Sequence, residues 1–465
     1  MGALTRALTD SGFLNIEAAL NVHDSTSHTM RQCILAWFDE WMRRAPDEDA
    51  GVDPCQRIPY AVVTRLNKAT FAEYDSTLNT KGEPIGKMAF IDGLRKNFDA
   101  RKFDIMQWAM IGGECMVKPV PMADGHITWQ VIRRDRYLVV GRAPDDTVTD
   151  IITAEKTAQG EKWYTLVERR TAGNDGRLTI QNLLFASTER GTLGSRVPLT
   201  SLAQYDALPE RYTYLQPIWG VGLVPVRMPI ANCVDGSADG VSVYEPAMGL
   251  IHNINRNEWQ LDREFELGRA RMVTSADLLT EINGKKTMHD DLFVGIDGNE
   301  ANVGITTFAP ALRGASYAER RQGYLKSVEN LLGFKRGLLS DAQAVEKTAT
   351  EITDSAGGYA LTIGDLQTVY YDALRCALRL GEQIGITYRL CDGTAWDEDA
   401  LAVTWGNGVL YDAAAEWQDR LTMVQSGMLR PELAIAWKFD LPCDTEADLQ
   451  FIRTKFMPDV ADTEV

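Results

Sequence analysis

The chain has 465 residues, of which 45% are hydrophobic and 24% charged, and it carries a formal net charge of −17. These values predict a folded protein with more than one core, and the absence of an apolar run of about 18 residues excludes a membrane-spanning helix. Proteins that bind DNA through its phosphates are usually basic, so the charge argues against tight binding but allows DNA to pass nearby.

Two further features concern the cellular setting. The N-terminus lacks the basic and then apolar pattern of a secretory signal. Seven cysteines, an odd number, are scattered without a C-x-x-C motif, so disulfides and zinc are both weak interpretations. We therefore expect assembly in a reducing cytosol.

The N-terminal part is predicted to be an α+β block. Amphipathic or apolar periodicity predicts helices over Met30–Arg43, Arg57–Leu78 and Ile91–Ile111. From Glu114 the period changes to two, which predicts an antiparallel meander. Its expected strands are Cys115–Val120, Ile127–Ile132, Tyr137–Val140, Val148–Ala154, Trp163–Arg169 and Leu178–Phe185.

Two long helices are predicted next, with a small β-rich insertion between them. A capping box at Ser242–Glu245 predicts a helix to about Gly268, and another at Ser316–Glu319 predicts a helix to Phe334. Between them, short strands are expected at Met272–Thr274, Phe293–Ile296 and Ile305–Phe308. A first helix of about 26 residues would be roughly 39 Å long, which is long for a helix that only packs on a domain.

A third capping box, Thr348 with Glu351, is expected to open a helix with a continuous apolar seam. The seam residues follow one another at alternating steps of four and three, a spacing that suits packing against a neighbouring helix. They are Ile352, Ala356, Tyr359, Ile363, Leu366, Tyr370, Ala373, Ala377 and Leu380.

The C-terminal part is predicted to be a strand followed by three short helices. The strand is Leu401–Trp405, and the helices cover Asp412–Ser426, Pro431–Lys438 and Asp444–Met457. Gly427 stands at a C′ position and Asp444 at an N-cap position.

No motif for catalysis or cofactor binding is complete in this sequence, so we expect no enzyme, no cofactor and no metal site. The lysine-bearing turns at Gly82–Lys87 and Gly284–Thr287 both lack the full P-loop pattern. The five histidines form no i, i+4 pair, and no Gly-x-Ser-x-Gly elbow occurs. Acidic clusters such as Asp397–Asp399 are typical of solvated surface, although an acidic two-domain bacterial hydrolase stays open as an alternative.

Three cations flank the loop before the seam helix: Lys335, Arg336 and Lys347. In a ring with that loop facing inward, they would form circles of positive charge for a sliding contact with phosphates. The alternative for Lys335 and Arg336 is a structural contact with the negative end of the preceding helix dipole.

The order of these elements resembles the portal proteins of tailed bacteriophages, of the type found in siphophages of Gram-positive hosts. The resemblance covers roughly residues 50–457. It depends on the order of the predicted elements more than on the identity of individual residues. The matching motifs are Gly240-Val241-Ser242, Glu264–Arg271, Leu338-Leu339-Ser340, Lys347-Thr348-Ala349-Thr350-Glu351, Val403-Thr404-Trp405 with Asp412, and the helix end at Gly427.

The resemblance implies a portal-like α+β subunit. Its parts would be an N-terminal arm and wing (1–240), a first stem helix (241–270), a β-rich clip (271–315), a second stem helix (316–336), a tunnel loop (337–350), a wing helix and strand (351–410) and a helical crown (411–465). Lys335, Arg336 and Lys347 would face DNA in the tunnel. Lys285, Lys286 and His289 would lie in the clip that docks the terminase.

For function, the resemblance implies a ring of about twelve subunits, or thirteen when isolated, at one capsid vertex of the virion. Double-stranded DNA would pass through it without sequence specificity during packaging and ejection. Its partners would be the large terminase, the scaffold and major capsid proteins, and a head-completion adaptor. The seam residues Ile352, Tyr359, Ile363, Leu366 and Tyr370 would pack between subunits.

Overall fold

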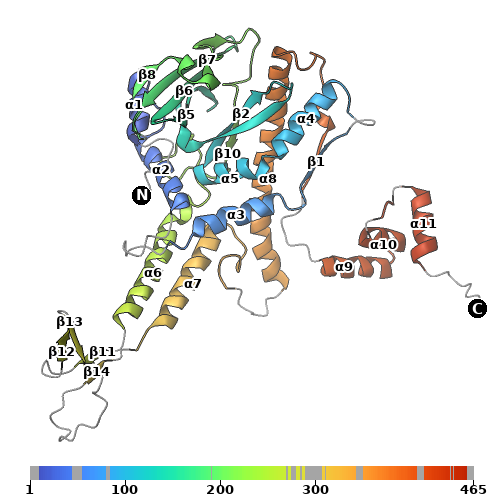
Figure 1. Cartoon of the computed structure of the whole chain (residues 1–465). Coiled ribbons are helices and arrows are strands. Elements are labelled where there is room, and N and C mark those ends of the chain that lie inside the picture. The colour runs from blue at the N-terminus through green and yellow to red at the C-terminus, as the bar shows by residue number, and fades with distance from the viewer. Residues whose placement is uncertain are drawn as a thin grey trace, which may run out of the picture. The chain divides into compact units, whose positions relative to one another are not determined.

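The computed structural model describes most of the chain, in thirteen separate ranges. These are 10–43, 55–79, 84–189, 191–268, 271–273, 279–282, 285–288, 306–308, 311–341, 349–405, 413–439, 441–443 and 445–457. The chain forms two compact units, Met1–Gly408 and Val409–Val465. The first unit contains helices, two larger sheets and the two long helices (Figure 1).

The N-terminal helices are α1 (Asp10–Leu20), α2 (His28–Met42), α3 (Ile58–Thr70), α4 (Lys87–Asp99) and α5 (Lys102–Gly112). Helix α2 confirms the prediction, and Ser27 caps it by accepting a hydrogen bond from the Met30 amide at 3.1 Å.

Two of the predicted helices are wrong in extent. The expected helix over Arg57–Leu78 stops at Thr70, and Asp75–Leu78 is strand β1, which pairs with β15 (Leu401–Thr404). The expected helix over Ile91–Ile111 is two helices, α4 and α5. Asp99 ends α4, and its carboxylate accepts hydrogen bonds from Tyr74 and Tyr370 at 2.7 and 2.8 Å. In both cases a partner distant in sequence overrides the local periodicity.

The six predicted strands are confirmed, but they belong to two sheets. One is antiparallel, in the order β10-β2-β3, and comprises β10 (Val224–Arg227), β2 (Glu114–Pro121) and β3 (Ile127–Arg133). The other has six strands, and β9 pairs with β7 outside the main order β4-β5-β6-β7-β8. Its members are β4 (Tyr137–Arg142), β5 (Val148–Gln159), β6 (Lys162–Ala172), β7 (Leu178–Ser187), β8 (Ser195–Val197) and β9 (Arg211–Thr213).

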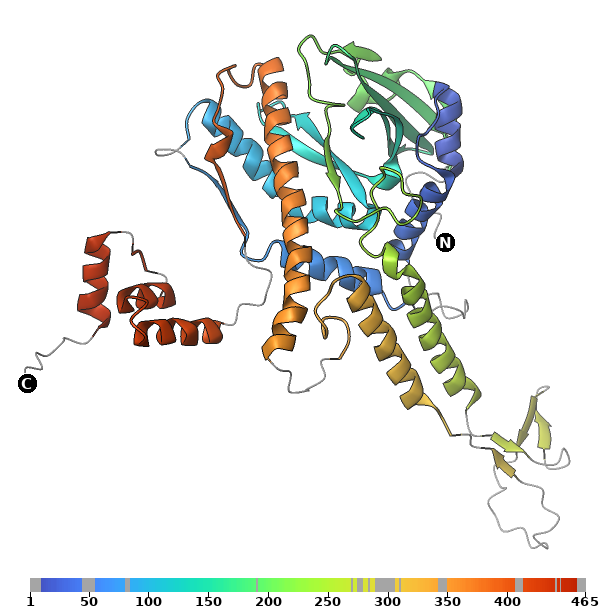
Figure 2. The same cartoon turned by 180° about the vertical axis from the view of Figure 1, so that it is seen from behind.

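Helix α8 (Ala349–Thr387) has 39 residues and runs past α3, α4 and α5 as one long helix, as both views show (Figures 1 and 2). From Tyr359 onward its apolar stripe is buried in the main hydrophobic core. The stripe packs on an aromatic cluster, in which Phe71 lies 4.8 Å from Tyr370 and Tyr74 lies 4.8 Å from Trp405. This cluster connects α3, α8 and the segment after β15.

The two long helices are α6 (Met248–Leu267) and α7 (Gly314–Leu331), and together we call them the stem. Between them lie two short antiparallel pairs, β11 with β14 and β12 with β13, which confirms a β-rich insertion. The strands are β11 (Arg271–Val273), β12 (Leu279–Ile282), β13 (Lys285–Met288) and β14 (Thr306–Phe308). The strand expected at Phe293–Ile296 lies outside the described residues.

The two capping boxes predicted for the stem are wrong. Helix α6 begins after a 3-10 turn at Glu245–Ala247, and the Ser242 hydroxyl donates to the Met110 carbonyl at 3.1 Å instead of capping α6. Helix α7 begins two residues before Ser316 and has no side-chain cap. The Thr348–Glu351 box involves residue 348, which lies outside the described residues.

In the second unit the three predicted helices are confirmed as α9 (Ala413–Gln425), α10 (Pro431–Phe439) and α11 (Glu446–Phe456). Gly427 has the positive φ of a C′ glycine, +73°. The N-cap of α11 is Thr445, which forms a capping box with Asp448, so the expected cap at Asp444 is displaced by one residue.

The crossing of two glycines joins the stem to the rest of the first unit. Gly113 ends α5 with φ +78°, and Gly240 lies against its carbonyl so closely that a Cβ on either residue would overlap the other backbone. On either side of the crossing, Glu114 and Asp239 both pair with buried Arg134, at 3.0 and 3.4 Å. Only glycine can occupy both positions without moving the stem.

We therefore expect Gly240→Ala to destabilise the protein by about 3 kcal/mol, because the added methyl group has no space beside the Gly113 carbonyl. The matched control is Gly93→Ala in helix α4, where an added Cβ meets no atom within 4 Å. It should stabilise the protein by roughly 0.5 to 1 kcal/mol, since alanine favours a helix over glycine. Urea unfolding of both variants measures the difference, and equal effects would contradict the steric argument.

Candidate functional site in the stem and the turn that follows it

The base of the stem is fixed to α5 and α2. The Val243 amide and the Ser242 hydroxyl both donate to the Met110 carbonyl, at 3.0 and 3.1 Å, near the C-terminal end of α5. The Tyr244 hydroxyl donates to the Trp37 carbonyl in α2 at 2.8 Å. Helix ends have free carbonyls, so α5 supplies an acceptor that sets where α6 starts.

The two stem helices are held together by polar contacts as well as by apolar packing. Asn257, which is fully buried, donates to the Tyr317 carbonyl at 3.1 Å. Arg320 donates to the Gln260 side chain at 3.3 Å. The apolar residues that the stem contributes to the main core are Ile251 and Ile254 of α6 with Leu325 and Val328 of α7.

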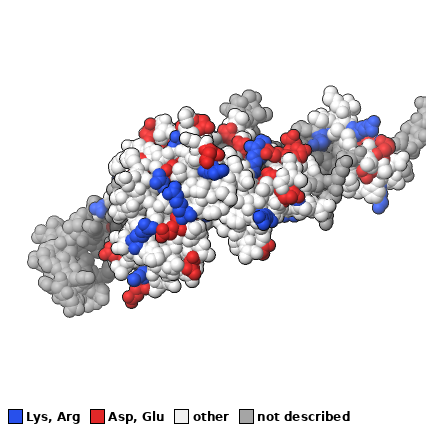
Figure 3. Space-filling view, turned by 90° about the horizontal axis from the view of Figure 1, so that it is seen from above, with Lys and Arg blue, Asp and Glu red and all other residues white. Residues whose placement is uncertain are grey.

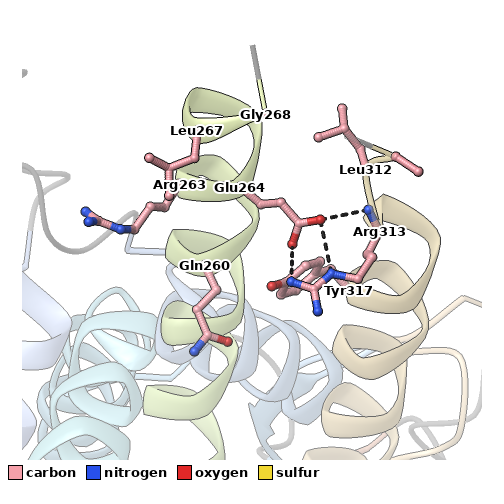
Figure 4. A pocket seen from close by; sticks show the side chains of 9 residues that line it. Gln260, Arg263, Glu264, Leu267, Gly268, Leu312, Arg313 and Tyr317 are labelled. Atoms are coloured by element: carbon pink, nitrogen blue, oxygen red, sulfur yellow. Dashed lines mark hydrogen bonds and ion pairs between the residues drawn. The ribbon is translucent and has the colours of Figure 1, made fainter. Parts of the chain in front are cut away.

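The far end of the stem carries a charged clasp between Glu264 and Arg313. The Arg313 guanidinium and backbone amide both donate to the Glu264 carboxylate, at 2.9 and 2.8 Å (Figure 4). These hydrogen bonds lower the pKa of Glu264 from its ordinary 4.5 to about 2. The clasp therefore joins the end of α6 to the start of α7 at the point where the β-rich insertion leaves the stem.

Beside this clasp lies an open groove of about 530 Å³. Arginine side chains and apolar side chains both line it, as Figure 4 shows. The lining residues are Gln260, Arg263, Glu264, Leu267, Gly268, Ala311, Leu312, Arg313 and Tyr317.

The turn after α7 is organised by one buried carboxylate, that of Glu329. It accepts hydrogen bonds from the backbone amides of Gly337 and Ser340, at 3.3 and 2.8 Å, and from the Leu339 amide. The Ser340 hydroxyl also donates to it at 2.8 Å. Because Glu329 has no exposed surface, these bonds supply its partners in place of water.

The predicted DNA-facing cations lie on this turn. Lys335 and Arg336 are both exposed, and neither has an ion-pair partner among the residues that the structure describes. They follow Leu332, the residue that caps the end of α7, by three and four positions. The two cations therefore occupy a fixed and accessible position, while Lys347 lies outside the described residues.

From Tyr359 onward the predicted seam is internal, which corrects the expectation that these residues pack between subunits. Tyr359, Ile363, Leu366 and Tyr370 are each at most 7% exposed within a single chain. They contact the chain's own core, so they have no free surface to offer a neighbour. Ile352 lies in the first turn of α8, and its side chain is outside the description.

Of the predicted clip residues, Lys285 and Lys286 lie in strand β13, opposite Ile282 and Glu281 of β12. The structure describes their backbone only, and His289 lies outside the described residues. Their role in docking a partner therefore stays a prediction.

Charge is distributed unevenly along the stem. From Arg313 to Arg336 the sequence holds six Lys or Arg residues and two Glu residues, in a chain whose net charge is −17. On the face seen in Figure 3, in contrast, acidic and basic side chains are interspersed. The second stem helix and its turn are thus a basic segment of an acidic protein.

Within the described ranges, no three His, Cys, Asp or Glu residues are grouped as metal ligands would be. No helix of the described part is both long and apolar enough to cross a membrane.

Sequence reasoning missed two carboxylates that organise this site. Glu264 opens the Glu264–Arg271 motif of the resemblance and Glu329 belongs to no motif, and the sequence neighbours of neither residue mark it as a hydrogen-bonding centre. The partner of Glu264 is 49 residues away, and the Glu329 partners are in an irregular turn. The local sequence does mark the two helix ends, because Gly268 and Gly333 follow them, but it does not mark the carboxylates that organise those ends.

Comparison with known proteins identifies no family: no protein-family model matches the chain, and no curated protein matches it. One matching solved structure is a chain described as "Neck of native GTA particle computed with C12 symmetry". It is 11% identical with a TM-score of 0.43, and the alignment covers 83% of this chain and 91% of that chain.

We expect Glu329→Gln to destabilise the protein by about 2 kcal/mol, because an amide cannot accept all the hydrogen bonds that the carboxylate accepts. Amide hydrogen exchange at Leu339 and Ser340 should accelerate with it. The control is Glu319→Gln on the same helix, where the exposed side chain should change stability by less than about 0.5 kcal/mol. Unchanged exchange in the turn would refute the anchoring role of Glu329.

The Glu264 clasp should respond to pH only in strong acid. Because the folded pKa is lowered to about 2, the clasp is fully present above the ordinary value of 4.5 and is lost as pH falls towards 2. Carboxyl-carbon NMR of the native protein should give this pKa for Glu264. In Arg313→Gln it should rise towards 4.5, and a titration that does not move would show that Arg313 is not the cause.

Proposed function

We propose that this chain is the subunit of a portal-like ring, a structural and non-catalytic component of a phage-like head-to-tail connector. The observation that carries the proposal is the stem: two antiparallel long helices, fixed at one end and joined at the other by a small β-rich insertion. The ordered turn and the single long helix α8 follow it, in the sequence expected of such a subunit. A paired-helix stem of this kind suits repetition around a central channel.

The distribution of charge supports a channel for DNA. About twelve copies would carry a net charge of roughly −200, which would repel a polyanion from most surfaces. Lys335 and Arg336 would interrupt that repulsion locally, because the turn that carries them is held by Glu329 and leaves both exposed. Together with Lys347, they would give DNA a weak contact along which it can slide.

The proposal also assigns partners. The β-rich insertion with Lys285, Lys286 and His289 would dock the large terminase during packaging, and a head-completion adaptor later. The scaffold and major capsid proteins would hold the ring at one vertex of the virion. Contacts between subunits would come from surfaces other than Tyr359, Ile363, Leu366 and Tyr370, which are buried in each chain.

The test is the mass of the full-length protein in solution by native mass spectrometry, with negative-stain images, both alone and with the scaffold protein. We expect particles of about twelve or thirteen chains with a central hole. A protein that stays monomeric at high concentration and with scaffold would overturn the proposal. Glycoside hydrolase activity in that monomer would favour the acidic hydrolase instead.

A further inference from the structure

The two sides of the stem differ in chemistry. One side carries four arginines, and we call it the arginine face. Arg263 and Arg313 line the same groove, and Arg320 donates to Gln260 of that groove. Arg256 stands seven residues, or two turns, before Arg263 on α6 and so lies on the same side of that helix. Aromatic rings alternate with them. The Arg263, Arg313 and Arg320 guanidinium groups lie 5.6, 5.9 and 5.5 Å from the rings of Trp259, Tyr317 and Tyr324.

The groove beside the Glu264–Arg313 clasp opens on this arginine face. Its apolar lining is exposed to a degree unusual for leucine, since Leu267 is 54% exposed and Leu312 is 45% exposed. The face therefore offers positive charge and uncovered apolar surface side by side (Figure 4). Apolar surface rimmed by charge is typical of a protein interface.

The other side of α6 has the complementary chemistry. Glu258, Asp262 and Phe265 follow one another at steps of four and three, so they form one edge of the helix, which we call the carboxylate edge. At about 100° per residue this edge lies roughly 140° around α6 from Arg256 and Arg263. Neither carboxylate has an ion-pair partner among the described residues, and Phe265 is 49% exposed.

Phe265 and the groove lie at the same level along the axis of the stem. Phe265 lies between Glu264 and Leu267, which both line the groove. Its position on α6 puts it on the carboxylate edge, and its ring lies close to Gly314 at the start of α7. A neighbouring copy related by rotation about an axis along the stem would thus present Phe265 at the level of this groove. The arginine face of one copy is therefore complementary to the carboxylate edge of the next copy. A closed ring of head-to-tail contacts requires such a pair of different surfaces on each subunit.

We propose that the arginine face of one subunit binds the carboxylate edge of the next copy of this chain, with Phe265 entering the groove and Asp262 facing Arg263. This inference rests on the proposed ring and names its contact surface in the stem. A polyanion is the other ligand with matching charge. It would leave Phe265, Leu267 and Leu312 uncovered, and Arg313 is already engaged by Glu264, so the second copy accounts for more of the surface.

The experiment exploits the two different sides of the contact in the full-length chain. Arg263→Glu places like charges opposite each other at every contact, and Asp262→Arg does the same from the other side. Each variant alone should lower the fraction of protein in rings by at least about tenfold, measured by native mass spectrometry at one subunit concentration. An equimolar mixture of the two should restore rings. In a ring of alternating variants the two introduced charges, which are opposite in sign, face each other at one contact, and the native Arg263 faces the native Asp262 at the next.

The control with the same change of charge is Arg177→Glu, in an exposed turn of the six-stranded sheet, which should form rings as the native protein does. Phe265→Ser should lower ring formation while circular dichroism stays native. The outcomes separate this interface from the proposed ring.

The proposed interface is wrong if the native protein forms rings and both single variants form them equally well. It is also wrong if mixing the two variants does not restore rings. In either case the proposed ring itself stands. If Arg263→Glu forms rings and loses only its retention on immobilised duplex DNA, the arginine face contacts DNA instead. A native protein that forms no ring overturns the proposed function itself.

Discussion

The architecture depends on the crossing of Gly113 and Gly240, with buried Arg134 beside it. Arg134 is 2% exposed and pairs with Glu114 and Asp239, the residues next to the two glycines. A buried charge is tolerated only when it is paired, so the three groups hold the two backbone segments in one arrangement. Helix α6 of the stem begins eight residues after Gly240, so this crossing fixes the chain just before the stem starts.

Two carboxylates have the same structural role further along the chain. Glu264 joins the far ends of the stem helices, and Glu329 gathers the amides of the turn that presents Lys335 and Arg336. An acidic chain thus uses individual acidic residues as structural centres. The basic segment from Arg313 to Arg336 stands out against it, and the proposed channel contact and subunit contact both draw on its residues.

The apolar stripe of α8 illustrates why the periodicity of a helix does not show which surface its apolar side packs against. Alternating steps of four and three predict a helix with one apolar side, and that helix is present. The same stripe would suit a neighbouring subunit or the chain's own core. The structure places Tyr370 in an aromatic cluster with Phe71 and Tyr74 within the chain's own core.

Local periodicity alone determined that this protein has helices, then a meander, then two long helices around a β-rich insertion, then a long helix and a helical end. Such patterns report which side of an element is apolar, and this depends only on neighbours in sequence. Tertiary structure decided what those sides contact: β1 pairs with β15, Asp99 ends α4, and Ser242 binds Met110 instead of capping α6. It also decided the partners of Glu264 and Glu329, because those hydrogen bonds and ion pairs join residues that only the folded chain brings together.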